Sequence, residues 1–99
     1  MAHTFPLTFA GSAVSDLQEM QKYYESEQTP ETGKRLLAEI IGVVEQIAEF
    51  PLSGRVVPEF NVAYLREIIH PPFRIVCRCD RKRVRIIRVW RSERLLKLP

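Results

Sequence analysis

Two stretches in the first half of the chain carry apolar residues at the three- and four-residue spacing of an amphipathic helix. In the first stretch, Ser12 or Ser15 is expected to cap the helix, with Asp16 in its first turn. The apolar positions of this helix are Val14, Leu17, Met20 and Tyr24. This pattern predicts one helix with a single apolar stripe.

The second stretch begins with a strong helix-start signal. Thr29 is expected as the N-cap, Pro30 fits the first helical position, and Glu31 suits the positive end of the helix dipole. Two neighbouring rows of apolar residues follow, and the helix is expected to end before Pro51. The rows are Leu36, Ile40, Val43, Ile47 and Phe50, and Leu37, Ile41, Val44 and Ala48. A stripe this wide predicts a well-buried helix that packs against the first as an antiparallel hairpin.

The remaining apolar runs have the two-residue period or the β-branched composition of strands. Residues 3–10 alternate in this way, and Pro6 favours an edge position. After a loop at 51–59, the runs 62–69, 73–79 and 84–90 are separated by short turns, which predicts an antiparallel meander. The last run carries apolar residues on both faces, so its pattern leaves open which face meets the helices.

The order β-α-α-β-β-β predicts an α+β fold. We expect a helical hairpin packed on a small, mainly antiparallel four-stranded sheet. The 99 residues of the chain allow one domain with one modest core, so residues 1–99 are expected to form a single domain.

Charge is divided unevenly between the two halves of the chain. Residues 1–54 hold three basic and eight acidic residues, a net charge of −5. Residues 55–99 hold twelve basic and four acidic residues, a net charge of +8, and ten of the twelve basic residues are arginine. Arginine binds phosphate or carboxylate through paired donors, so the basic half suggests an anionic partner. A solvated sheet face rich in arginine is the alternative.

Several classes of protein are excluded by the sequence. Cys77 and Cys79 do not make a disulfide framework, and two residues apart on one strand they are poorly placed to pair. No nearby Cys or His completes a metal site, and no cofactor motif is present. The first residues lack the positive region of a secretory leader, and no apolar stretch is long enough to span a membrane, so we expect neither a leader nor a membrane span. We therefore expect a reduced, cytoplasmic protein without metal or cofactor.

Arg74 and Arg78 lie four residues apart on one predicted strand and therefore share a face. Two interpretations remain open for this pair. The two arginines line a surface for the anionic partner, or they pair with helix carboxylates such as Glu45 and Glu49.

The chain resembles the RelE/ParE superfamily of bacterial toxins from type II toxin–antitoxin systems, which includes proteins described as plasmid stabilisation proteins. Residues 9–17 (FAGSAVSDL) are similar to the strand-to-helix opening of that superfamily, and residues 50–59 (FPLSGRVVPE) to its helix exit and loop. Residues 65–68, 73–78 and 87–90 resemble its last three strands. The resemblance is closer to the ParE-like than to the RelE-like members.

One implication of the resemblance is a ribosome-dependent mRNA endonuclease of the RelE type. Such metal-free cleavage needs a base, a cationic group for the phosphorane and an acid. The resemblance places Arg74 at the position of a catalytic strand arginine and Glu59 near a general-base glutamate. Other candidates for the cationic role are Arg55, Arg66 and Arg91.

The acid is missing from the expected place. RelE-like nucleases carry a tyrosine, or a histidine and a tyrosine, near the C-terminus, whereas this chain has no tyrosine after Tyr64 and no histidine after His70. His70 lies before two prolines and is interpreted as a turn residue. Arginine is a poor acid because it does not deprotonate.

The other implication is a ParE-like toxin that inhibits DNA gyrase without catalysis, and we favour this interpretation. An inactive or repurposed family member is the third possibility. For any anionic partner, the expected binding residues are Arg66, Arg74, Arg78, Arg88, Arg91 and Arg94. The resemblance further implies a cognate antitoxin with an acidic, partly disordered C-terminal segment that the basic half would attract.

Overall fold

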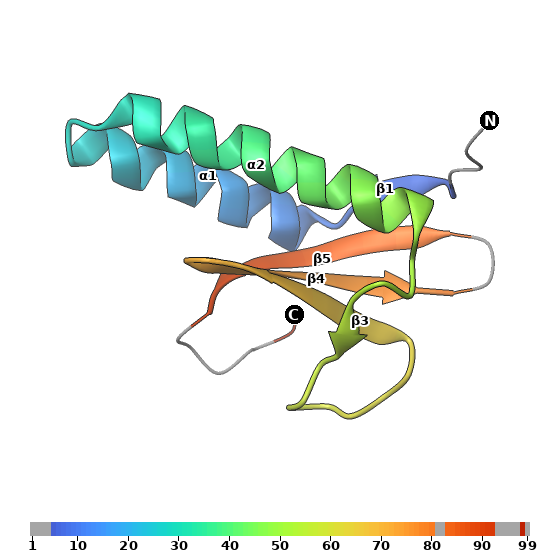
Figure 1. Cartoon of the computed structure of the whole chain (residues 1–99). Helices are drawn as coiled ribbons and strands as arrows, with labels where there is room; N and C mark the ends of the chain where they lie inside the picture. The colour runs from blue at the N-terminus through green and yellow to red at the C-terminus, as the bar shows by residue number, and fades with distance from the viewer. Residues whose placement is uncertain (1–4, 81–82, 93–97, 99) are drawn as a thin grey trace.

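The two predicted helices form a hairpin that covers one face of a β-sheet (Figure 1). The structure is a computed structural model, and it describes residues 5–80, 83–92 and 98. The helices are α1 (Gly11–Ser26) and α2 (Pro30–Glu49). The strands are β1 (Leu7–Phe9), β2 (Arg55–Val56), β3 (Leu65–His70), β4 (Phe73–Cys79) and β5 (Val84–Arg91). The predicted α+β fold, with its helical hairpin and mainly antiparallel sheet, is confirmed.

The sheet has five strands in the order β1-β5-β4-β3-β2, so the prediction of four strands is wrong by one. The extra strand, β2, lies inside the segment that was predicted as a loop, and it pairs antiparallel with β3. Gly54 permits this pairing, because a Cβ at that position would lie 2.6 Å from the Glu67 carbonyl oxygen. Turn-forming residues around so short a strand hide it from the hydrophobic pattern.

The strand predicted at residues 3–10 is shorter than expected. Only Leu7–Phe9 form β1, and residues 3 and 4 lie outside the described part of the chain. β1 pairs in parallel with β5 at the edge of the sheet, which confirms the edge position expected from Pro6. The Pro6 carbonyl extends this pairing by accepting a 2.9 Å hydrogen bond from the Val84 amide.

Helix α1 begins earlier than predicted. Its N-cap is Ala10, which has no side chain able to cap, so the expected capping by Ser12 or Ser15 is wrong. The Ser12 hydroxyl instead donates a 2.6 Å hydrogen bond to the Ile87 carbonyl oxygen on β5. No acidic residue lies in the first turn, and Asp16 faces β5 from further along the helix. The polar residues at this end of α1 therefore attach the helix to the sheet.

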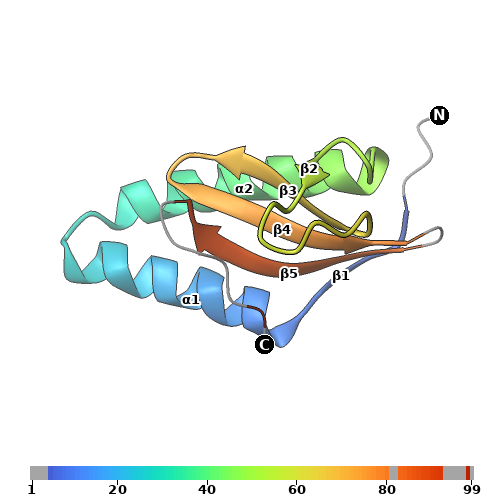
Figure 2. The same ribbon diagram turned by 90° about the horizontal axis from the view of Figure 1, so that it is seen from below.

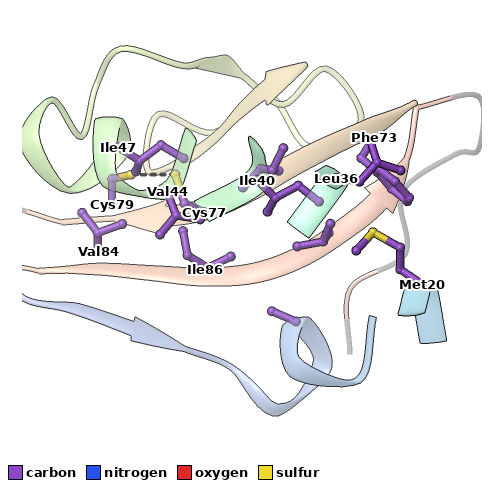
Figure 3. Packing of buried hydrophobic residues seen from close by; sticks show 13 residues of the cluster. Met20, Leu36, Ile40, Val44, Ile47, Phe73, Cys77, Cys79, Val84 and Ile86 are labelled. Atoms are coloured by element: carbon purple, nitrogen blue, oxygen red, sulfur yellow. Dashed lines mark hydrogen bonds between the residues drawn. The ribbon is translucent and has the colours of Figure 1, made fainter. Parts of the chain in front are cut away.

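Helix α2 supplies most of the helical side of the core. Its start at Thr29 and Pro30 agrees with the prediction. Figure 3 shows four of its buried side chains over β4 and β5, namely Leu36, Ile40, Val44 and Ile47. Phe50, at the end of the apolar row of α2, is 59% exposed, and Val14 of α1 is 41% exposed. The predicted apolar stripes are therefore wider than the buried ones.

A β-bulge determines which side chains of β5 point toward the helices. The register with β4 shifts at Val76 and Cys77, so that Ile87 has no direct partner. Residues before and after the bulge, Val84, Ile86 and Val89, therefore all face the helices. Ile87 and Trp90 face the opposite side of the sheet. A two-residue period cannot predict this arrangement because the extra residue changes the phase.

The far face of the sheet carries a second, smaller core. Val57, Leu65 and Val76 form its buried centre, with Trp90 packed beside them. The segment between β2 and β3 crosses β4 on this side (Figure 2). Both faces of the central strands are therefore covered, and charged side chains on this far face are partly enclosed.

Candidate functional site

Four charged side chains are linked by hydrogen bonds on the far face of the sheet, and Glu67 of β3 lies at the centre of the group. Glu67 is 1% exposed, and its two carboxylate oxygens accept hydrogen bonds of 2.7 Å from Nε of Arg55 and Nε of Arg74. Arg74 also donates two hydrogen bonds, each 2.7 Å long, to the two oxygens of Glu59. We call Arg55, Glu67, Arg74 and Glu59 the carboxylate–arginine network.

The network neutralises its own charges. Arg74 is 5% exposed, and its two carboxylate partners occupy donors on each side of the guanidinium. The pKa of Arg74 is raised, first by the hydrogen bond with Glu59 and then by Glu67, while burial opposes the shift. Two arginines and two glutamates sum to zero net charge, so this part of the basic half presents no excess of positive charge.

Glu67 is the functional-site residue that the sequence interpretation missed. Its signal was its position two residues after Leu65, which places both side chains on the same buried face of β3. A carboxylate at such a position is buried only when it is paired, and arginines on neighbouring strands supply the partners. Arg55 does so from β2, directly opposite Glu67 in the register.

The structure separates the residues predicted for catalysis. Glu59, Arg55 and Arg74 lie together in the network, but Arg66 and Arg91 lie elsewhere. Arg66 donates to the carbonyl oxygens of Ala63 and Gly54, at 2.8 and 3.3 Å. The guanidinium of Arg91 lies 5.8 Å from the ring centre of Phe73, on the side of the helices. No single group contains all five predicted side chains.

The residues predicted for anion binding are also divided. Arg88 donates two hydrogen bonds, 2.8 and 2.7 Å long, to the carboxylate of Asp16 and lies over the ring of Trp90. Arg94 lies outside the described residues. Arg74 pairs with Glu59 and Glu67, so neither Glu45 nor Glu49 is its partner. Within the described residues, the expected arginines do not form one shared positive surface.

Arg78 and Arg85 differ from Arg55, Arg74 and Arg88, which are paired with carboxylates. They lie directly opposite each other on β4 and β5, exposed on the far face. Arg78 stacks on Tyr64 at 4.6 Å, and Arg85 donates a 3.1 Å hydrogen bond to the Thr8 hydroxyl. Neither has a carboxylate partner among the described residues. Like charges placed opposite each other repel, and a bound anion would relieve that repulsion.

Apolar surface lies beside these arginines. A groove of 360 Å³ next to Arg78 is lined by Phe60, Val62, Tyr64 and Leu65 among others. A second groove, of 880 Å³, lies by the loop after α2, where Leu52 is 65% exposed. Exposed apolar side chains grouped in this way are typical of protein-binding surfaces.

His70 ends β3 and contacts α2, as a structural residue would. One of its ring nitrogens, Nε2, lies 2.7 Å from Glu39, and this contact lowers the pKa of the Glu39 carboxyl. His70 pairs with Phe73 at the turn and contacts α2 on the helix side of the sheet, whereas the network lies on the opposite face. In the part of the chain that the structure covers, no three His, Cys, Asp or Glu side chains gather as a metal site would require. No helix described here is long and apolar enough to cross a membrane.

Comparison with known proteins adds a family and two solved structures. The family described as "ParE toxin of type II toxin-antitoxin system, parDE" matches residues 7–96. A chain of the "Chromosomal ParDE TA system from P. aeruginosa" is 24% identical with a TM-score of 0.75, over 92% of this chain and 99% of that chain. A chain of the toxin-antitoxin complex RelBE2 from Mycobacterium tuberculosis is 18% identical with a TM-score of 0.67, over 95% and 98%. No curated protein matches the chain.

Proposed function

Because this chain belongs to the ParE family of toxins from type II toxin–antitoxin systems, we propose that it inhibits growth by binding DNA gyrase without catalysing a reaction. A cognate antitoxin neutralises it by binding the toxin. The cytoplasm, which holds the bacterial gyrase, is the proposed site of action. The observation that carries the noncatalytic proposal is that Glu59 and Glu67 occupy the donors of Arg74 within the carboxylate–arginine network.

An RNA-cleaving site needs an arginine whose donors are open to the reacting phosphate. Arg74 is instead buried, and two carboxylates occupy its donors. Glu59, the proposed base, is held at both oxygens by the same guanidinium. A base held in this way must break two charge-assisted hydrogen bonds before it can accept a proton, which disfavours that role.

The nuclease stays the second candidate because of one observation. Glu59 and Arg74, which the resemblance assigned to the base and the phosphorane, lie in direct contact. If an mRNA substrate opened that contact, the two groups would be adjacent as cleavage requires. The two proposals therefore differ in whether toxicity depends on the Glu59 carboxylate.

The variant Glu59→Gln separates the two candidates. The glutamine keeps the size of the side chain but cannot act as a base. Because the Glu59 side chain is 19% exposed and that of Glu67 is fully buried, Glu59→Gln should cost the fold less than Glu67→Gln, and circular dichroism checks that the variant is folded. A gyrase binder with this substitution should arrest growth as the unmodified toxin does. A nuclease should lose about 10²–10⁴-fold in the rate of mRNA cleavage on translating ribosomes. Glu31→Gln, at an exposed helix position, is the matched control.

Growth arrest that disappears with Glu59→Gln, together with mRNA cuts made by the unmodified toxin, would overturn the noncatalytic proposal. If the unmodified toxin neither arrests growth nor acts on gyrase or mRNA, the chain is an inactive or repurposed member of the family.

The proposed antitoxin contact rests on charge and apolar surface together. Both solved structures named above come from toxin–antitoxin systems. In this chain, Arg78 and Arg85 occupy directly paired positions of β4 and β5, are exposed, and have no carboxylate partners among the described residues. The groove beside Arg78 offers apolar side chains. An antitoxin segment that alternates acidic and apolar residues would fit both features.

A further inference from the structure

Two thiols lie side by side in the core, closer than the sequence analysis expects for residues two apart on one strand, and nothing in the toxin proposal uses them. Cys77 and Cys79 point from β4 toward α2, and their Sγ atoms are 3.0 Å apart (Figure 3). Val44 and Ile47 of α2 belong to the same packed cluster. Both thiols are free, and Cys77 is 1% exposed while Cys79 is 5% exposed.

The surroundings of the two thiols differ. Cys79 lies at the end of β4 and lines the 880 Å³ groove, together with Phe50, Tyr64 and Arg66. Cys77 is absent from the lining of that groove and is sealed by the helical side of the core. A small polar oxidant that enters the groove therefore meets Cys79 first.

Electrostatics give the two thiols opposite roles. The hydrogen bond with Cys77 lowers the pKa of Cys79, and the positive charge of Arg66 lowers it further, while burial and the negative charge of Asp80 oppose the shift. The hydrogen bond with Cys79, and then burial, raise the pKa of Cys77. These directions favour Cys79, the sulfur that lines the groove, as the thiolate of the pair. A thiolate beside a cation is the reactive form of cysteine.

We propose that Cys77 and Cys79 form a peroxide-reactive dithiol, in which Cys79 attacks the oxidant and Cys77 resolves the product into an intramolecular disulfide. This modification site is independent of whether the toxin acts on gyrase or on mRNA.

The reaction balances with hydrogen peroxide as the oxidant. The Cys79 thiolate attacks one peroxide oxygen, the O–O bond breaks, and the leaving hydroxide takes up a proton as water. Cys79 becomes a sulfenic acid. The Cys77 sulfur then attacks the Cys79 sulfur, the S–O bond breaks, and the departing hydroxide takes the proton of Cys77 as a second water. Two thiols are oxidised by two electrons, and one peroxide is reduced to two waters.

The disulfide is expected to disturb β4. Residues two apart on a strand have Cα atoms separated by about 6.6–6.8 Å, which is at the upper end of the disulfide range. The strand must contract locally to close the bond, at a position already next to the bulge and under α2. A bond formed under such constraint is readily reduced, so the modification should be reversible by thiols.

The direct test treats the reduced, folded full-length chain with hydrogen peroxide and follows its mass. We expect each monomer to lose both thiol hydrogens, a peptide spanning both cysteines to retain an internal disulfide, and dithiothreitol to restore the starting mass. If both cysteines stay open to alkylation after treatment and unfolding, the proposal is wrong. Products that are only disulfide-linked dimers, or only sulfinic and sulfonic acids, would also overturn it.

Variants test the assigned roles. Cys77→Ser should stop the reaction at the Cys79 sulfenic acid, which dimedone labels, and Cys77→Val serves the same purpose if the serine variant does not fold. Arg66→Gln should slow the oxidation by about threefold to tenfold, because it lowers the thiolate fraction of Cys79. Lys34→Gln removes a cation from an exposed helix position and should leave the rate unchanged. Equal rates for Arg66→Gln and Lys34→Gln would contradict the role given to Arg66.

Discussion

Glu67 shows how one buried carboxylate decides what its neighbours can do. It is fully enclosed, and two arginines from different strands donate to its two oxygens. The desolvation cost of such a group is offset only while both partners remain in place. Arg74 is therefore held for structural reasons, and this constraint reduces its availability to a substrate.

Glu67→Gln should destabilise the fold by about 3 kcal/mol, because it removes the fully buried charge with which both Arg55 and Arg74 are paired. Unfolding in urea, followed by circular dichroism, measures the change. The exposed position Glu31 provides the control, and Glu31→Gln should stay within about 0.5 kcal/mol of the unmodified chain. If Glu67→Gln cost no more than this control, the structural role given to the network would be wrong.

The contact between Glu39 and His70 predicts a pH dependence. Hydrogen bonds from His70 and then from Arg35 lower the pKa of Glu39 below its ordinary value of 4.5. A carboxyl whose pKa falls on folding stabilises the fold above its unfolded pKa, and that stabilisation is lost as the pH falls through the folded pKa. The unmodified chain should therefore be more stable than Glu39→Gln at about pH 5–6, and the difference should vanish well below about pH 4. A difference that persists or grows in acid would contradict this assignment.

At the scale of elements, the spacing of apolar residues predicted the helices and the longer strands, but it missed the short strand β2 and the bulge opposite β5. Both helices and the three strands of the meander follow from apolar spacing, and the start of α2 follows from Thr29 and Pro30. Strand β2 has two residues, too few to show any period. The facing of β5 depends on a bulge, and the bulge depends on contacts with other strands. The start of α1 was misplaced because its serine bonds to β5 in place of its own helix end.

The same limit explains the candidate site. The sequence brought Arg55, Glu59, Arg66, Arg74 and Arg91 forward as one chemical group, and the structure places Arg55, Glu59 and Arg74 together but not Arg66 or Arg91. Their mutual neutralisation depends on Glu67, and Glu67 is buried because β3 pairs with both β2 and β4. Pairing between strands distant in sequence is not visible in a local pattern.

Strand β2 gives a test at this scale. Gly54→Ala places a methyl group 2.6 Å from a backbone oxygen of β3, so β2 must move away from the sheet. We expect a loss of about 2 kcal/mol or more, since backbone cannot yield as a side chain does. Gly42→Ala, on α2 with open space around it, should stabilise the chain by about 0.5–1 kcal/mol. Thermal unfolding compares the two, and similar shifts in the same direction would contradict the role of Gly54.

At the scale of the whole molecule, ion pairs neutralise arginines within each half of the chain and, through Arg88 and Asp16, between the two halves. Carboxylates from the helices, loops and strands pair with Arg35, Arg55, Arg74 and Arg88, and this leaves little shared positive surface in the described residues. Arg78 and Arg85 remain as an exposed pair. The net charge therefore overstates the positive surface available to a partner.

Removing the charges of Arg78 and Arg85 should weaken the binding of the cognate antitoxin. For Arg78→Gln combined with Arg85→Gln, we expect about tenfold weaker binding and a smaller dependence of affinity on salt. The double variant Lys22→Gln and Lys34→Gln removes the same charge from the helices and should bind as the unmodified toxin does. Calorimetry at two salt concentrations measures both quantities. Equal loss in the two double variants would mean that net charge, and not this pair, attracts the antitoxin.

The most direct test of the noncatalytic account is a supercoiling assay with purified gyrase and the purified toxin. The account predicts that supercoiling falls as the toxin approaches the concentration of gyrase, that added antitoxin restores it, and that Glu59→Gln inhibits equally well. Full gyrase activity in molar excess of toxin, with mRNA cut on ribosomes by the same preparation, would contradict it.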